Sequence, residues 1–368
     1  MRRGAIILLV FLLGFQNNRQ STELWPLPDL YYFPPLPKGF KTPRLVEVQL
    51  GRRLFYDPIL SADGSLSCAS CHQQASAFSG GGMQFNLGIE GFPQKRNTPG
   101  LFNLAWLEQF FWDGRAKTLE EQALVPVRDP HEMNLDWPKA VERLKGDSYY
   151  GPQFASVYPR QKLDSNLVVL ALAQFERILF SQDSKYDRVL RGEDYFSSLE
   201  YRGYTLVNLQ NKGDCLHCHI TDAHALGTHG KLSNNGLEAA NQAGDYADAG
   251  AGAQLGPEKQ GWFKVPSLRN LGFTAPYMHD GRFATLREVL EFYRSGVQQP
   301  YNADSKMQFA HQGGVALTDE ELEAIFFDST RDGVRGIFKR YDFDTYEKIE
   351  KYLSNLDASA QIFTPQPL

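Results

Sequence analysis

Two pentapeptides in this chain combine residue types that attach haem covalently: Cys68-Ala69-Ser70-Cys71-His72 and Cys215-Leu216-His217-Cys218-His219. In each, the cysteines can form thioether links to a porphyrin, and the histidine that follows can supply an axial imidazole to its iron. The motifs use all four cysteines of the chain. A four-cysteine zinc site is the alternative, but it would leave both adjacent histidines unexplained. We therefore predict two covalently bound haem c groups, with His72 and His219 as proximal iron ligands.

The first twenty residues have the pattern of an export signal. Arg2 and Arg3 precede an apolar run from Ala5 to Phe15, which is too short for an ordinary membrane span. Because covalent haem attachment is generally completed outside the cytoplasm, signal and motif together predict a periplasmic address. No clear small-x-small cleavage site follows, so an uncleaved N-terminal anchor is the alternative.

The composition indicates a soluble globular protein over the rest of the 368 residues, with 42% hydrophobic and 22% charged residues. A net charge of -5 argues against a nucleic-acid partner. The length allows two domains, and the haem motifs are far enough apart for one in each. We predict a signal or anchor over 1–20, a proline-rich lead-in over 21–45, an N-terminal domain over 46–185 and a C-terminal domain over 195–357.

Helical spacing of apolar residues recurs along the chain, whereas strand signals are sparse. The Gly-rich segments Gly80–Gly100 and Gly227–Gly261 indicate loops, and polar Ser184–Glu193 indicates a domain boundary. The pattern predicts a mainly α protein with long loops. The expected helices are Val46–Phe55 (ended by Asp57-Pro58), Leu119–Val125, Pro138–Leu144, Asn166–Phe180, Leu199–Leu209, Leu286–Tyr293 and Leu322–Phe327, the last begun by Thr318.

From about Val46 onward the chain resembles the bacterial dihaem cytochrome c peroxidases and their relative MauG. The resemblance implies two cytochrome c-like helical domains, each enclosing one haem, packed so that the haems face a shared interface. It rests on sequence blocks that occur in one order around the two haem motifs. The blocks are Leu50–Asp57, Arg96–Pro99, Phe111–Arg115, Leu119–Ala123, Asp129–Met133, Val265–Asn270 and Thr274–Arg282.

The resemblance makes the N-terminal haem the one that meets peroxide, on the face opposite His72. In many of these peroxidases a distal histidine caps that iron until the other haem is reduced. Here no histidine lies between His72 and His131, and the capping region Asn86–Gly91 offers Glu90 instead. We therefore expect an open site that needs no reductive activation, as in MauG.

Three further residues stand at functional positions of the family. Glu132 is at the distal-glutamate position and could move a proton between the two peroxide oxygens. Pro126 is at the position that packs over the distal face. Trp112 is at the position of the tryptophan between the haems, where an oxidisable indole can relay an electron. Taken alone, Glu132 would pass for a residue at a helix start and Trp112 for a core residue.

The second haem is the electron-handling one in the family. The peroxidases place a distal methionine where this chain has Tyr293, as MauG does. A tyrosinate oxygen favours ferric or higher iron, whereas a methionine thioether favours ferrous iron; Met278 and Met307 remain alternatives. The resemblance also implies a calcium ion between the haems, with Asn97, Thr274 and Pro276 at its ligand positions. His279 is expected to shape the haem surroundings without binding iron.

Two activities are compatible with this set of residues. The first is a periplasmic peroxidase that reduces hydrogen peroxide to water with electrons from a small cytochrome c or cupredoxin. The alternative is a MauG-like oxidase, which holds two oxidising equivalents across both haems and oxidises Trp or Tyr residues of a partner protein. A non-catalytic electron carrier is disfavoured, because it needs neither an open iron nor a distal carboxylate. The sequence is also compatible with a homodimer. Two departures from MauG, Gly213 and the additional stretch Asp328–Tyr346, argue against carrying over MauG's own protein substrate to this chain.

Overall fold

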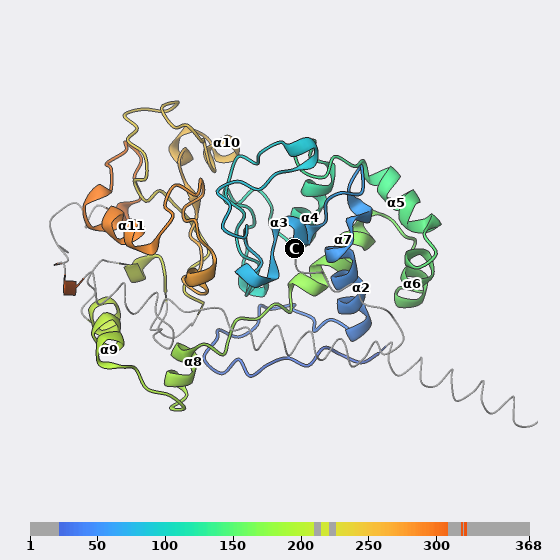
Figure 1. Ribbon diagram of the computed structural model, residues 1–368, viewed down its shortest axis with the longest axis horizontal. Helices are drawn as coiled ribbons and strands as arrows, with labels where there is room; N and C mark the ends of the chain where they lie inside the picture. Colours follow the sequence, from blue (N-terminus) through green and yellow to red (C-terminus); the bar gives the residue numbers. More distant parts are fainter. Residues whose placement is uncertain (1–21, 210–214, 221–225, 308–317, 319, 322–368) are drawn as a thin grey trace, which may run out of the picture.

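A computed structural model describes residues 22–209, 215–220, 226–307, 318 and 320–321. Helices and loops dominate, as the sequence predicts. Figure 1 shows the elements up to α7 on one side and those from α8 onward on the other. The α-helices are α2 (Leu45–Tyr56), α3 (Cys68–Cys71), α4 (Leu119–Arg128), α5 (Trp137–Gly146), α6 (Tyr150–Val157), α7 (Ser165–Glu176), α8 (Lys185–Leu190), α9 (Ser198–Tyr204), α10 (Gly252–Leu255) and α11 (Leu286–Glu291).

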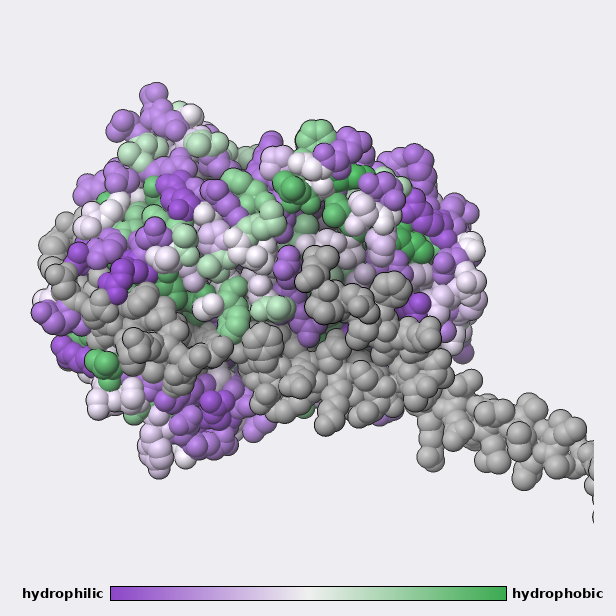
Figure 2. All heavy atoms as spheres, in the orientation of Figure 1, coloured by the Kyte–Doolittle hydropathy of each residue, from purple (hydrophilic) through white to green (hydrophobic). Residues whose placement is uncertain are grey.

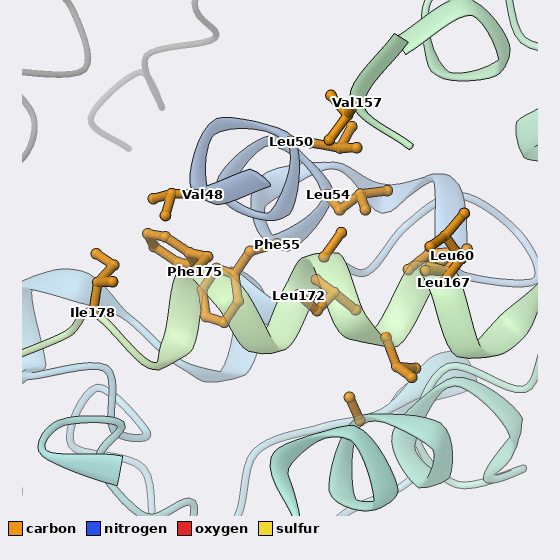
Figure 3. Packing of buried hydrophobic residues seen from close by; sticks show 14 of the residues in the cluster. Val48, Leu50, Leu54, Phe55, Leu60, Val157, Leu167, Leu172, Phe175 and Ile178 are labelled. Atoms are coloured by element: carbon orange, nitrogen blue, oxygen red, sulfur yellow. The ribbon is translucent and has the colours of Figure 1, made fainter. Parts of the chain in front are cut away.

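The core of the N-terminal half forms where α2 crosses α7. Glu47 accepts the backbone N–H of Arg44 at 2.7 Å and so helps to begin α2, and Pro58 follows soon after its end. Asp164 caps α7 by accepting the N–H of Leu167. Figure 3 shows Phe55 of α2 and Phe175 of α7 packed between the two helices, with ring centroids 5.2 Å apart. The predicted helices in this half are confirmed, although α7 ends four residues earlier than expected.

The helices approach closely because Gly51 lies at their crossing. A Cβ placed on Gly51 would stand 1.8 Å from the carbonyl oxygen of Ala171. We expect Gly51→Ala to destabilise the haem-loaded protein by about 2–3 kcal/mol, because the clash is with backbone that cannot rotate away. Urea unfolding followed by circular dichroism measures the change.

Gly146→Ala is the matched control for this substitution. Gly146 also lies in a helix, α5, but nothing stands within 4 Å of the added methyl group. Its stability should stay level or rise by up to about 1 kcal/mol, since alanine favours the helix. Equal stability of the Gly51 variant and the parent would mean that the two helices are not held at this distance.

The proline-rich lead-in joins both halves of the molecule. Trp25 packs into the core around α2 and α7, whereas Phe33 packs into a second apolar cluster with Tyr186 and Leu268. Between these clusters lies Trp106, whose indole N–H donates to the carbonyl of Pro34 at 3.0 Å. The lead-in is therefore a structural strap rather than a free tail.

The segment Ser184–Glu193 differs from a plain polar linker, because it contains α8. Ser184 caps this helix, and Asp187 within it is buried against Arg269. The polar residues thus serve capping and ion pairing. The domain limits 46–185 and 195–357 stay a prediction.

The C-terminal half is held by short elements around long loops. Strand β1 (Leu232–Ser233) pairs antiparallel with β2 (Phe263–Lys264), with Leu232 opposite Lys264. Helix α9 continues as a π-helix over Thr205–Leu209, and α11 continues as another over Phe292–Gly296. These confirm the helices expected before the second motif and around Tyr293.

Other predictions fall partly or wholly outside the residues described. Thr318 and Glu321 form the expected helix-start hydrogen bonds. The signal or anchor over 1–20, Gly213, Leu322–Phe327 and Asp328–Tyr346 lie outside those residues. Within the described ranges, no helix has the length and apolar character needed to cross a membrane. The face in Figure 2 mixes hydrophilic and hydrophobic residues.

Candidate functional site

The first pentapeptide forms a short helix that aims its histidine into the core. Helix α3 covers Cys68–Cys71, and His72 is its C-terminal cap. The His72 Nδ1 atom lies 2.8 Å from the carbonyl oxygen of Phe78. Because a carbonyl only accepts, Nδ1 carries the proton and Nε2 keeps a free lone pair. Burial lowers the pKa of His72, which favours the neutral imidazole that binds iron.

The second pentapeptide repeats this arrangement with different partners. His219 Nδ1 lies 3.0 Å from the carbonyl of Pro266 and 3.3 Å from that of Gly227. Burial lowers the pKa of His219 to about 4, so the ring is neutral at physiological pH. Both carbonyls again leave Nε2 available as a ligand atom.

A large, mostly apolar pocket opens beside His219. Cys215, Cys218 and His219 line one part of it, and Tyr293 lines another. Residues of the N-terminal half, including Asn97 and Trp112, complete the wall. The pocket therefore lies where the two halves meet and contains two thiols, a neutral imidazole and apolar walls.

These residues fit haem better than zinc. Burial raises the pKa of the Cys71 thiol to about 11 and that of Cys68 further, which disfavours the thiolates that zinc requires and suits uncharged thioethers. In the described part of the chain, no three His, Cys, Asp or Glu side chains gather as a metal site. Haem would be held through the cysteines and the free Nε2 atoms of His72 and His219.

Glu132 lies close to the first pentapeptide in a partly buried loop. Burial raises its pKa to about 7, with a further contribution from Asp129, while Arg115 opposes the shift. Its charge also raises the pKa of Cys71, which places the carboxyl near that thiol. A carboxyl with a pKa near neutrality can both accept and return a proton at physiological pH.

The surroundings of Glu132 are fixed by backbone contacts. The carbonyl of Glu132 accepts the N–H of Ile89 at 2.8 Å, and the carbonyl of Pro126, within α4, accepts that of Met133 at 3.1 Å. The loop at Gly88 and Ile89 can come this close to the segment His131–Glu132 because Gly88 has no side chain: a Cβ there would stand 1.7 Å from the carbonyl oxygen of His131. Glu90 is exposed, with a φ of 58°, so its side chain lies at the surface. The structure thus brings the backbone segments of Pro126 and Glu132 together and leaves the side chain of Glu90 exposed.

Trp112 is held rigidly on the pocket wall. Its indole N–H donates to the carbonyl of Asn97 at 2.7 Å, and its own carbonyl accepts the N–H of Lys264 at 2.6 Å. The adjacent Asp113 is buried and binds Arg96, which also binds Asp248 from the C-terminal half at 2.6 Å. This ion-pair network fixes Trp112 at the junction of the two halves.

Tyr293 lies on a π-helix and lines the pocket beside His219. Its hydroxyl accepts a hydrogen bond from Asn235 Nδ2 at 3.2 Å, and burial raises its pKa to about 12. The same amide lies 3.8 Å from the sulfur of Met278. Met307 also lines the pocket. All three candidate ligands of the second iron therefore share one pocket with His219.

The residues expected to bind calcium, Asn97, Thr274 and Pro276, also line this pocket. Asn97 Nδ2 donates to the carbonyls of Met83 and Gln84, at 3.1 and 3.2 Å, so its Oδ1 is the atom suited to a cation. His279 lies nearby with its ring stacked on that of Phe263, the ring centroids 3.6 Å apart.

Two residues beside these sites, Asn235 and Glu176, belong to no motif that would mark them in the sequence. Asn235, which binds the Tyr293 hydroxyl, stands in an Asn-Asn-Gly sequence within the Gly-rich segment 227–261 that the sequence predicts to be a loop. Glu176 is buried on α7, and its Oε2 has no hydrogen-bond partner among the described residues. Burial raises its pKa to about 8, so it is mostly protonated at neutral pH. A lone acidic residue on an apolar helix face was the available signal.

Comparison with known proteins agrees with this arrangement. Residues 46–195 match the family described as di-haem cytochrome c peroxidase. The methylamine utilization protein MauG of Methylophilus methylotrophus is 32% identical, over 89% of this chain and 95% of its own length. The chain belongs to the dihaem cytochrome c peroxidase and MauG family. It is also 34% identical to the cytochrome c peroxidase Ccp of Escherichia coli strain K12, over 75% of this chain and 60% of Ccp.

A solved structure extends the likeness to the fold. The crystal structure of a MauG-like protein associated with microbial copper homeostasis superposes with a TM-score of 0.70 and 31% identity, covering 82% of this chain and 93% of that one. As a member of the dihaem peroxidase family, the chain is a haem peroxidase-type oxidoreductase that uses haem cofactors. Membership also implies peroxide as oxidant and a redox or protein partner.

Proposed function

We propose that the protein reduces hydrogen peroxide to water with electrons from a small cytochrome c or cupredoxin. The partly buried carboxyl of Glu132 beside the first pentapeptide, with a pKa raised to about 7, carries this proposal. Balanced reduction of one peroxide consumes two electrons and two protons. A carboxyl that titrates near neutrality can take a proton from one peroxide oxygen and deliver it to the other.

The first haem, when bound through Cys68 and Cys71, supplies the iron at which the O–O bond is cleaved. Residues of the chain provide positioning and proton transfer around it. His72 presents Nε2 because Phe78 holds Nδ1. Glu132 would move the proton, and Pro126, whose carbonyl binds the neighbouring Met133, would limit access of water.

Trp112 is proposed as the electron relay between the two haem positions. Its indole N–H binds a backbone carbonyl, which cannot accept a proton. An oxidised Trp112 would therefore keep its proton and pass the oxidation on as a charge alone. The second haem, when held by Cys215, Cys218 and His219, would receive electrons from the donor.

A second candidate function has its own supporting observation. Tyr293 lines the pocket beside His219, and its hydroxyl accepts a hydrogen bond from Asn235. A tyrosinate ligand would disfavour ferrous iron and make the second haem a poor acceptor of electrons. This favours MauG-like chemistry, in which Trp or Tyr residues of a partner protein are oxidised with the equivalents of peroxide.

Two further proposals concern a bound calcium ion and the location of the protein in the cell. A calcium ion bound by Asn97 Oδ1 and the carbonyls of Thr274 and Pro276 would brace the junction beside Trp112. A periplasmic location is proposed from the basic and apolar N-terminal segment together with the two haem motifs.

We expect the diferric protein to contain one high-spin and one low-spin haem and to react with peroxide without prior reduction. No histidine lies between His72 and His131, and Glu90 lies at the surface. Electron paramagnetic resonance during peroxide titration tests this. With a reduced small cytochrome c, the peroxidase should then oxidise two donor molecules for each peroxide in repeated turnover.

His131→Ala is the control, because His131 is the next histidine along the chain and its side chain is 60% exposed. It should leave both signals unchanged. Two low-spin signals, with activity only after partial reduction, would exclude the open site. If the first haem is high-spin and reacts with peroxide, but the protein does not oxidise the reduced cytochrome c in repeated turnover, the MauG-like function is favoured over the peroxidase.

A further inference from the structure

The pocket beside His219 has an imbalance of charge on its walls. Among its lining residues in the described part of the chain there is no Asp or Glu, whereas Lys264 and Arg269 are both present. Arg269 is already neutralised, because its guanidinium binds the carboxylate of Asp187 at 2.5 and 2.9 Å with both side chains buried. Lys264 is therefore the basic residue whose charge needs a partner.

No described residue supplies a counter-ion for Lys264. Burial alone lowers the pKa of its ammonium group to about 8, with no charged or hydrogen-bonding neighbour contributing to the shift. The other ionisable ring nearby, His279, is neutral because burial lowers its pKa to about 4. A partly buried cation without a partner is costly, so a cavity lined by one is suited to an anion.

Lys264 is also firmly placed within the fold. It lies in β2 opposite Leu232 of β1, and its backbone N–H donates to the carbonyl of Trp112 at 2.6 Å. Trp112 and Lys264 thus stand next to each other on the pocket wall, within a hydrogen-bonded framework. The backbone of Lys264 is thus fixed relative to Trp112, and its side chain lines the same pocket.

We propose that Lys264 binds a propionate carboxylate of the haem carried on Cys215 and Cys218, at the side of the pocket next to Trp112. Ferric haem with both propionates ionised is net negative, and a tyrosinate from Tyr293 would add to that charge. Lys264 would then offset the negative charge and orient this haem toward Trp112. The inference depends on the second haem position and not on which of the two proposed activities the enzyme has.

The midpoint potential of the second haem tests this proposal. In haem-loaded Lys264→Gln, loss of a nearby positive charge should stabilise ferric iron. At a fixed ambient potential the ferrous-to-ferric ratio of the low-spin haem should fall about tenfold, which equals about 59 mV for a one-electron couple. Lys264→Arg should restore most of the ratio. Spectroelectrochemistry at the low-spin haem bands gives these values.

Lys231→Gln is the matched control, since Lys231 is exposed and precedes β1 directly. It removes the same charge outside the pocket and should leave the potential unchanged. The propionate-bending band in the resonance Raman spectrum is the second readout, and it should move in Lys264→Gln but not in Lys231→Gln. An unmoved band and potential in Lys264→Gln, or an equal shift in the control, would overturn the proposal. Should Lys264→Gln fail to hold its second haem, Lys264→Met takes its place: a lower ferrous-to-ferric ratio with a moved Raman band would support the proposal, and an unchanged ratio and band would overturn it.

Discussion

Replacing Glu132 by Gln is expected to slow the reaction with peroxide by about 10²–10⁴-fold, the range for loss of a positioned acid–base group. An amide keeps the shape of the side chain but cannot take up the proton. Both haems should stay attached, because Glu132 forms no part of either pentapeptide. Stopped-flow absorbance of the diferric protein mixed with peroxide measures the rate.

The pH profile of the same reaction gives a second result. The carboxylate form of Glu132 accepts the proton, and its pKa is raised to about 7. The rate should therefore rise as the pH increases through about 7, and the Gln variant should lack this inflection. Glu90→Gln is the matched control, since Glu90 is exposed on the neighbouring loop. A parent-like rate in Glu132→Gln would assign the proton transfer to another group.

Changes at Tyr293 are expected to decide how the two haems share oxidation. If its oxygen binds the second iron, Tyr293→His should keep both haems but abolish storage of two oxidising equivalents across them. The oxidation would then be confined to the first haem. Tyr293→Phe should lose the parent low-spin signal or replace it with that of another ligand. Optical and electron paramagnetic resonance spectra after one equivalent of peroxide measure both effects.

The control for this pair is Tyr301→Phe, which removes the hydroxyl of a tyrosine that binds the carbonyl of Pro257 near the surface. Its spectra should match the parent. A sulfur-to-iron charge-transfer band in the parent that survives Tyr293→Phe would identify a methionine ligand instead. Met278→Leu and Met307→Leu would then show which methionine it is, and the peroxidase function would stand alone.

Local pattern accounts for most of the helices that were predicted. Apolar residues at helical spacing in α2, α4, α5 and α7 give each helix one face to bury, and neighbouring prolines and capping residues set their ends. Segment Ser184–Glu193 was less predictable. Its polar residues resemble a linker, but they cap α8 and pair Asp187 with Arg269, which lies 82 positions away.

The sequence by itself predicted the haem attachment residues and the two candidate axial histidines, because these depend on residue type and order. Glu132, Trp112 and Tyr293 were predicted only through the resemblance to the family. Only the tertiary structure decided the raised pKa of Glu132, the orientation of both imidazoles and the exposure of Glu90. It also placed Asn235 beside both Tyr293 and Met278, and left Lys264 without a carboxylate in its pocket. These properties arise from burial and from neighbours distant in sequence, since a pKa or a hydrogen bond depends on what the fold brings within a few ångströms.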